Sequence, residues 1–351
     1  MALFHPHRRS PFLRFWLPLV VALVRFASPL AAAEPRPALV SATGEARLEL
    51  AAGRRIAVKL PQGAELEATA TLDTGWLAAG TQPAAGAGAR DLLLLTGDGA
   101  TTSPLPSPPG RTGTLRQGPL PLVDDGRLAG IAWLEGDSRR SLGVRFAAWN
   151  GAGWDLPQVV APPGPGSQLA LTAARLADGS WLLAWSAFDG KDDEIVWTRG
   201  RSGSWSRPQR VAADNAVPDT TPALTAVPGG ALLAWSRYDG NDYRVVTSRF
   251  QKGKWTRPET AAGAGTFYPT FETVGSGKPI LLYRTADPQG WEALAVDTAG
   301  RPLRRAAVPA GSADSARTRP QVSETADGVT FRWPAVQGPG SERAAAWERK
   351  P

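Results

Sequence analysis

The chain of 351 residues contains no cysteine, and its only histidines and its only methionine lie within the first seven positions: His5, His7 and Met1. The rest of the chain therefore has no thiol and no imidazole. This excludes disulfides, cysteine nucleophiles and a Ser-His-Asp triad beyond residue 7. It also argues against zinc and copper sites, which normally use those ligands. We expect no cofactor, with calcium as the one exception considered below.

The formal net charge of +7 suggests a nucleic-acid partner at first sight. Residues 1–33, however, contain four arginines and no acidic residue, so the chain beyond them carries only +3. No basic stripe is left there for a phosphate backbone to contact. The sequence therefore predicts no nucleic-acid partner.

Residues 1–33 have the pattern of a bacterial secretory signal. Basic residues precede the apolar run FWLPLVVALV (Phe15–Val24), and small residues in SPLAAA precede Glu34. We expect cleavage there, export to the periplasm or beyond, and no transmembrane segment afterwards. RRSPFLR resembles a twin-arginine signal, and both export routes stay open. The alternative is an uncleaved anchor over residues 15–33, although its apolar run of 10 residues is short for a membrane span.

A repeat of 48 to 53 residues runs through the rest of the chain. It is clearest in WLLAW and ALLAW, and each unit has one anchor residue after a short apolar run. The anchors are Gly80, Trp133, Trp185, Trp235, Tyr283 and Trp333. Such regular self-similarity indicates that the chain stacks one supersecondary unit several times.

Each unit contains four short runs separated by turn residues, which predicts four antiparallel strands. Six such sheets at this period predict an all-β, six-bladed β-propeller over residues 65–351. The last unit has only three runs. We therefore expect Arg55–Pro61, within the N-terminal strands of residues 34–64, to complete the last blade and cover its open edge. Residues 37–51 would add a strand pair outside the ring.

The Gly-x-Trp pattern in SGSWSRPQRV and KGKWTRPETA resembles the BNR or Asp-box repeats of sialidase-like six-bladed propellers. The glycine lies one residue closer to the tryptophan than in that family, and no Asp stands at the expected place. The resemblance implies a six-bladed propeller fold from about residue 65 to the end. It also implies a possible glycosidase with an arginine triad, an acid/base Asp and a Tyr–Glu nucleophile pair, none of which the motifs place.

Two similar loops, AFDGKDDE and RYDGNDYR, place Asp189 and Asp239 at equivalent positions. The structural interpretation is that Asp-Gly simply forms the turn. A second is a calcium site made from the oxygen ligands of one loop. The candidate ligands are either Asp189, Asp192 and Asp193, or Asp239, Asn241 and Asp242. A third is acid/base catalysis by Asp189 and Asp239, with Tyr268 as another catalytic candidate.

In five units, the residue just before the first strand should face the mouth of the channel: Gly118, Gln168, Thr221, Tyr268 and Arg319. Tyr268 and Arg319 could contact a sugar or a carboxylate there. Arg237 and Arg284, just after their anchors, could join them and Asp239 in binding a ligand. The alternative is that these cations stack on aromatic rings or pair with acids inside the blades.

Most tryptophans stand at anchors or at the fourth strand, where they are expected to pack between blades, as at Trp154, Trp205 and Trp255. Trp149, Trp197 and Trp291 are the candidates for a sugar platform. The leading hypothesis is an exported, non-catalytic propeller that binds a glycan or an envelope protein. The alternatives are a sialidase-like glycoside hydrolase or lyase, and a purely structural partner in an assembly.

Overall fold

The computed structural model describes residues 38–42, 45–50, 55–98, 101–201, 203–213, 215–274, 277–308, 320–325, 328–332 and 345–348. These residues form strands, turns and loops and no helix. Accordingly, no helix in this part of the chain has the length and apolarity needed to cross a bilayer. The expected signal segment, Arg319 and Trp333 lie outside the described residues. The all-β class predicted from the sequence is confirmed.

The predicted four-strand units are present as antiparallel meanders. The first two are β4 (Glu65–Leu72), β5 (Gly75–Pro83), β6 (Arg90–Gly97) and β7 (Ser103–Leu105), then β8 (Leu115–Asp124), β9 (Arg127–Gly136), β10 (Leu142–Ala148) and β11 (Gln158–Ala161). A single parallel bridge between Arg90 and Leu115 joins these two meanders.

The next two units have a divided outer strand. They are β12 (Gln168–Arg175), β13 (Trp181–Phe188), β14 (Asp193–Arg201), β15 (Ser204–Trp205) and β16 (Gln209–Arg210), then β17 (Asp219–Val227), β18 (Gly230–Tyr238), β19 (Tyr243–Gln251), β20 (Lys254–Trp255) and β21 (Glu259–Ala262). In each, both outer pieces pair with the same third strand. The break follows the Gly-x-Trp pattern and falls at Arg207-Pro208 and Arg257-Pro258, because proline has no N–H to donate to a ladder.

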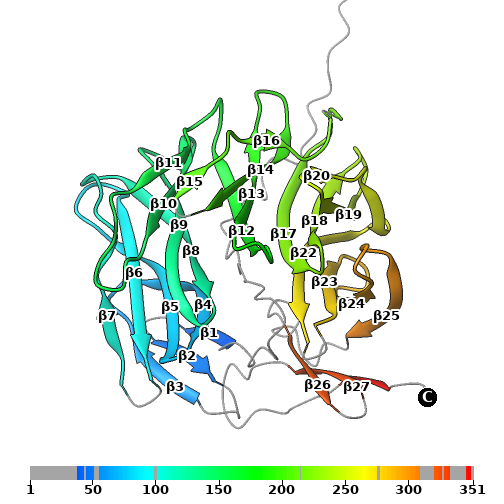
Figure 1. Ribbon diagram of the computed structural model, residues 1–351, viewed down its shortest axis with the longest axis horizontal. Coiled ribbons are helices and arrows are strands. Elements are labelled where there is room, and N and C mark those ends of the chain that lie inside the picture. The colour runs from blue at the N-terminus through cyan, green and yellow to red at the C-terminus, as the bar shows by residue number, and fades with distance from the viewer. Residues whose placement is uncertain are drawn as a thin grey trace, which may run out of the picture.

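The remaining sheets are β22 (Thr266–Thr273), β23 (Pro279–Thr285), β24 (Gly290–Val296) and β25 (Pro302–Val308), then β26 (Gln321–Thr325), β27 (Gly328–Arg332) and β28 (Ala345–Glu348), and an N-terminal sheet of β1 (Ala38–Ala42), β2 (Glu45–Glu49) and β3 (Arg55–Lys59). The sheets follow one another around a central axis, with their first strands innermost (Figure 1). This radial arrangement makes the fold β-propeller-like.

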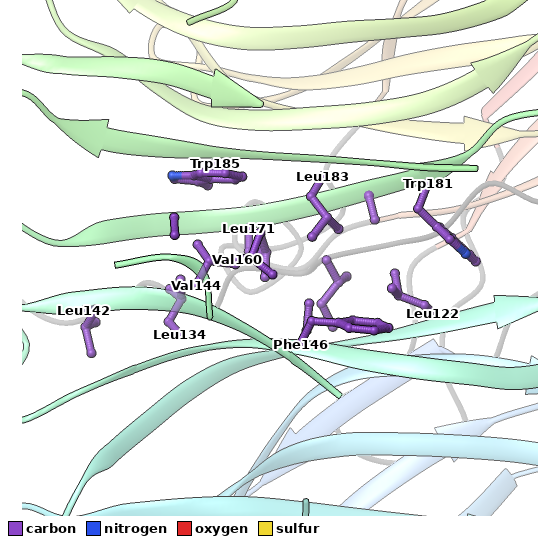
Figure 2. Close-up of a cluster of buried hydrophobic side chains, with 14 of the residues drawn as sticks. Leu122, Leu134, Leu142, Val144, Phe146, Val160, Leu171, Trp181, Leu183 and Trp185 are labelled. Atoms are coloured by element: carbon purple, nitrogen blue, oxygen red, sulfur yellow. The ribbon is translucent and has the colours of Figure 1, made fainter. Parts of the chain in front are cut away.

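The core lies between neighbouring sheets, as the anchors predicted. Trp133, Trp185, Trp235 and Tyr283 are fully buried. Figure 2 shows Trp185 and Leu183 of one sheet packed toward Leu134, Val144 and Phe146 of the sheet before it. Gly80 takes the anchor position in the first unit because a Cβ there would lie 1.9 Å from the backbone oxygen of Glu65.

Tryptophans of the outer strands also pack between sheets, as expected. Trp205 meets Phe146 of the preceding unit with ring centroids 5.1 Å apart, and Trp255 meets Trp197 at 6.0 Å. Trp154 packs against a cluster shared by the β4–β7 unit and its own unit, and donates to the backbone oxygen of Pro106 at 2.6 Å. These residues therefore join units to each other.

The strand proposed to close the last blade is placed differently from the prediction. Arg55–Lys59 pairs with β2 in register from Arg55↔Glu49 to Lys59↔Glu45, in the separate sheet β1–β2–β3. Among the described residues, β26–β27–β28 has no fourth strand. The physical reason is local: β1, β2 and β3 form a continuous meander, and Leu48 and Val58 complete a core cluster with Trp76 of the next unit.

Candidate functional site

In four consecutive units, a bulge interrupts the first strand at the same point. These strands are β8, β12, β17 and β22. One residue there adopts a left-handed backbone, with φ of +60° at Gly118, +52° at Ala170, +52° at Thr221 and +51° at Tyr268. The register shifts at each of these positions. Gly118, Thr221 and Tyr268, predicted to stand just before their first strands, lie inside those strands at this equivalent point. Gln168 is wrong by two residues, since the third equivalent is Ala170.

Gln168 has a different role. It lies two residues before the bulge residue Ala170, and its side chain contacts its own sheet. Its side-chain oxygen accepts a hydrogen bond from the indole N–H of Trp185. In the neighbouring units the same strand position holds Arg116 and Asp219, opposite Glu135 and Arg237. These two cross-strand ion pairs have opposite polarity at equivalent places.

Tyr268 is the large side chain among the four left-handed positions. A left-handed backbone is unfavourable for a bulky residue and is worth examining where it occurs. Its N–H donates to the hydroxyl of Ser236 at 2.9 Å, which fixes the bulge against the preceding sheet. The side chain is 48% exposed. The fold therefore holds an aromatic ring at the inner rim of the sheets, in a conformation that costs energy.

Tyr238 and Tyr243 lie at the same end of the sheets as Tyr268. Together these three residues are called the tyrosine cluster below. Tyr238 and Tyr243 are opposite each other on β18 and β19, and their ring centroids are 5.0 Å apart at 45°. Tyr268 also packs edge-to-face on Phe267 at 5.2 Å. Tyr243 is exposed as well, so the cluster presents ring surface to solvent.

Burial raises the pKa of the Tyr243 hydroxyl, and the nearby acidic groups of Tyr268, Tyr238 and Asp193 raise it further. The phenol stays neutral at physiological pH. Asp193 begins β14 of the preceding unit, opposite Phe188. Its own pKa is raised, first by burial and then by the charges of Asp192 and Asp189. The site thus combines the neutral phenol of Tyr243 with a half-buried carboxylate.

Asp189 and Asp239 are engaged in their turns. One oxygen of Asp239 accepts the backbone N–H groups of Asn241 at 3.0 Å and Asp242 at 2.9 Å, and the other pairs with Arg244. Asp189 is bound in the same way by two backbone N–H groups and by Arg210 at 2.7 Å. These backbone hydrogen bonds and cations lower the pKa of both carboxyls. The geometry agrees with the turn interpretation.

Carboxylate oxygens of Asp189, Asp192 and Glu194 lie within 4.8 Å of one another. This set differs from the predicted calcium trio in having Glu194 instead of Asp193. Oxygen ligands of this kind suit calcium chemically. A cation there would compete with Arg210, which already pairs with Asp189.

Arg237 forms a bidentate pair with Asp219, with Nε–Oδ1 at 2.8 Å and Nη2–Oδ2 at 2.7 Å. The guanidinium also lies 5.6 Å from the ring of Trp235. The hydrogen bonds that Arg237 donates to Asp219 raise the pKa of Arg237. Arg284 lies 5.7 Å from the ring of Phe267. Both arginines therefore follow the structural alternative of stacking and pairing, while Arg284 borders the tyrosine cluster through Phe267.

A Tyr–Glu pair also exists, which sequence reasoning did not find. The Tyr283 hydroxyl donates to Glu292 at 2.6 Å. The Tyr283 side chain is fully buried at an anchor, and burial, followed by the hydrogen bond and charge of Glu292, raises its pKa. A nucleophilic phenol needs access and a lowered pKa. Tyr283 is therefore a core residue, and the partly exposed Glu292 accepts its hydrogen bond.

The tryptophans proposed as a sugar platform are mostly inaccessible. Trp197 and Trp291 are buried, and Trp149 packs against Trp154 with centroids 4.8 Å apart. Tyr238 and Tyr243 were missed because they stand beside the conspicuous Asp-Gly motif, which drew attention to the aspartate. One signal in the sequence could have identified them: two tyrosines flank this turn, whereas the equivalent turn of the preceding unit is flanked by Phe188 and Asp193.

No family model matches the sequence, and no curated protein matches it. A solved structure of a protein of unknown function from Dyadobacter fermentans is similar over 81% of this chain and 94% of its own, at 12% identity and a TM-score of 0.56. A prolyl endopeptidase structure is similar over 86% of this chain but only 46% of its own, at 13% identity and a TM-score of 0.50. These likenesses concern the fold alone. They agree with a β-propeller-like arrangement.

Proposed function

We propose that this protein is an exported, non-catalytic propeller that binds a glycan at the tyrosine cluster. The proposal includes the six-bladed repeat over residues 65–351, beside which the β1–β3 sheet packs. Export is supported by the signal-like pattern of residues 1–33. Binding is supported by three phenol rings and Asp193 gathered at one end of neighbouring sheets.

The single observation that carries the proposal is Tyr268, an exposed aromatic ring on a strained backbone. Tyrosine offers a large, rigid apolar face together with a hydroxyl, a combination suited to the faces and hydroxyls of a sugar. Ala170 and Thr221, at the equivalent positions of the two preceding units, put small side chains at the same rim.

A sialidase-like hydrolase is the weaker alternative. The candidate acids Asp189 and Asp239 have lowered pKa values, whereas a general acid needs a carboxyl that keeps its proton. Tyr283, which donates to Glu292, is fully buried. Arg237 already forms a bidentate pair with Asp219. We therefore expect no turnover of aryl-sialosides or other aryl-glycosides.

The test uses Tyr268→Gly and a thermal-shift screen against neutral and charged oligosaccharides. Glycine relieves the left-handed backbone, which costs a side-chain-bearing residue roughly 1–2 kcal/mol, so the variant should be as stable as the parent or more so. A ligand that binds only the folded state raises the Tm of the parent. We expect that shift to disappear in Tyr268→Gly.

Two variants serve as controls. Tyr268→Phe keeps the ring and should keep most of the shift. Leu303→Ala removes an exposed apolar side chain from β25, away from the cluster, and should leave the shift unchanged. The proposal fails if no oligosaccharide shifts the Tm of the parent, or if Tyr268→Gly responds like the parent.

A further inference from the structure

A polar pocket of about 190 Å³ lies at the end of β9 and β10, in the second four-strand unit. Three segments line it: the connection before β8, the β9–β10 hairpin and, through Pro163, the connection before β12. A cavity of about 150 Å³ is enough to hold a benzene ring, so this pocket can take a group the size of one sugar ring. Its lining residues in the described part of the chain include no aromatic side chain. Charge and hydrogen bonds, and not ring stacking, therefore set its chemistry.

Arg145 on β10 brings a positive charge to the wall of the pocket. Its Nε lies 3.4 Å from Oε1 of Glu135, and its side chain is 29% exposed. Within the described ranges, its guanidinium makes no hydrogen bond. Glu135 is held through its other oxygen, because Oε2 accepts Nε of Arg116 at 2.9 Å and the indole N–H of Trp133 at 3.0 Å. Arg145 therefore keeps N–H donors that the fold does not use.

Arg111 adds a second guanidinium, from the connection before β8. Its Nη2 contacts one oxygen of Asp137, and both of these side chains are largely exposed. An ion pair in solvent is weak, so an oxyanion of a ligand can replace Asp137 at little cost. Ser141 also lines the pocket and offers a hydroxyl, and Arg139 and Arg140 are exposed in the same β9–β10 turn. Around this pocket, arginines outnumber acids.

We propose that this pocket binds an oxyanion, a carboxylate or sulfate group of a small ligand, between the guanidiniums of Arg145 and Arg111. A planar guanidinium presents paired N–H groups that match two oxygens of such a group. An ammonium ligand would instead meet two arginines. The pocket belongs to the second unit and its neighbouring connections, whereas the tyrosine cluster belongs to the fourth and fifth units. The proposal therefore does not depend on the proposed glycan-binding function.

The experiment is isothermal titration calorimetry of the purified protein at constant ionic strength. The probes are glucose, glucuronate, glucose 6-sulfate and sodium sulfate, so that the three sugars share one ring and differ at C6. We expect at least one charged sugar to bind at least about tenfold more tightly than glucose. The difference should shrink as salt is raised. Tighter binding of only one charged sugar would support the proposal and identify the group, and sodium sulfate binding as tightly as glucose 6-sulfate would support it for the free ion.

Matched variants locate the effect. Arg145→Gln should weaken binding of the charged sugar at least about tenfold, since a charge-assisted bidentate contact is lost. Arg111→Gln should weaken it as well, and its exposed position makes loss of folding no concern. Arg305→Gln is the control, because Arg305 lies 3.6 Å from Glu292, which also accepts a hydrogen bond from an anchor side chain, yet does not line this pocket. It should bind like the parent.

Three results would overturn the proposal. One is binding of glucose as tight as that of both charged sugars, or no binding of any charged probe. Another is parent-like affinity in both Arg145→Gln and Arg111→Gln. The third comes from Tyr268→Gly, which tests the glycan-binding function and should bind the charged sugar like the parent. Loss of binding there would place the anion at the tyrosine cluster and not in this pocket.

Discussion

At the scale of single residues, the aspartates at this end of the sheets differ in how well the fold stabilises their ionised forms. Turn N–H groups and arginines stabilise the ionised forms of Asp189 and Asp239, whereas burial and like charges disfavour the ionised form of Asp193. A stabilised carboxylate contributes to folding. A carboxylate whose ionised form is disfavoured lowers the stability of the fold. Groups of this kind are common in binding sites.

Asp193 therefore predicts a pH-dependent stability difference. A carboxyl whose pKa is higher in the folded than in the unfolded state contributes stability when protonated, and this contribution is lost as the pH rises through the folded value. Asp193→Asn cannot ionise. In the absence of ligand, we expect it to match the parent near pH 3 and to exceed the parent's Tm by about 1–2 °C at pH 7. Equal Tm values at pH 7 would contradict the unfavourable placement of this carboxylate.

At the scale of elements, the Asp-Gly hairpins show what a local motif can and cannot predict. DGKDD and DGNDY indicated turns, and the structure has both, since Asp and Gly satisfy turn geometry by themselves. The convergence of Tyr243, Tyr268 and Asp193 could not be predicted, because these residues come from three different sheets. The bulges at Ala170 and Thr221 were also hidden, because a register shift depends on the partner strand.

The turn role of Asp239 is open to a direct test. Asp239→Ala removes the acceptor for two backbone N–H groups and should destabilise the protein by about 1 kcal/mol. Asp239→Asn retains an acceptor oxygen and loses only the exposed pair with Arg244, so its cost should be well under 1 kcal/mol. Urea unfolding of both variants measures the difference. A loss of ligand affinity in Asp239→Asn at unchanged stability would instead assign this aspartate to the binding site.

At the scale of the whole molecule, the repeat predicted the succession of sheets but not the position of the N-terminal strands. Its period is visible because Trp133, Trp185 and Trp235 fill equivalent spaces between neighbouring sheets. The strands before residue 65 lack such an anchor. Complementarity of edges suggested that Arg55–Pro61 would join the last sheet, yet the short connections between β1, β2 and β3 favour pairing within the segment.

The β1–β3 sheet should consequently be part of the cooperative fold and not an appendage. Leu48 is fully buried and belongs to one cluster with Val58, Leu66 and Trp76. Leu48→Ala should destabilise the protein by about 2–5 kcal/mol, the usual cost of a buried leucine. Leu233→Ala, in the middle of the ring, should have a similar cost. Calorimetry would show one transition that moves down in both variants. If Leu48→Ala left the main transition unchanged, or split off a separate one of low stability, then β1–β3 would fold independently, because a side chain in a shared core cannot be truncated without weakening both surfaces it joins.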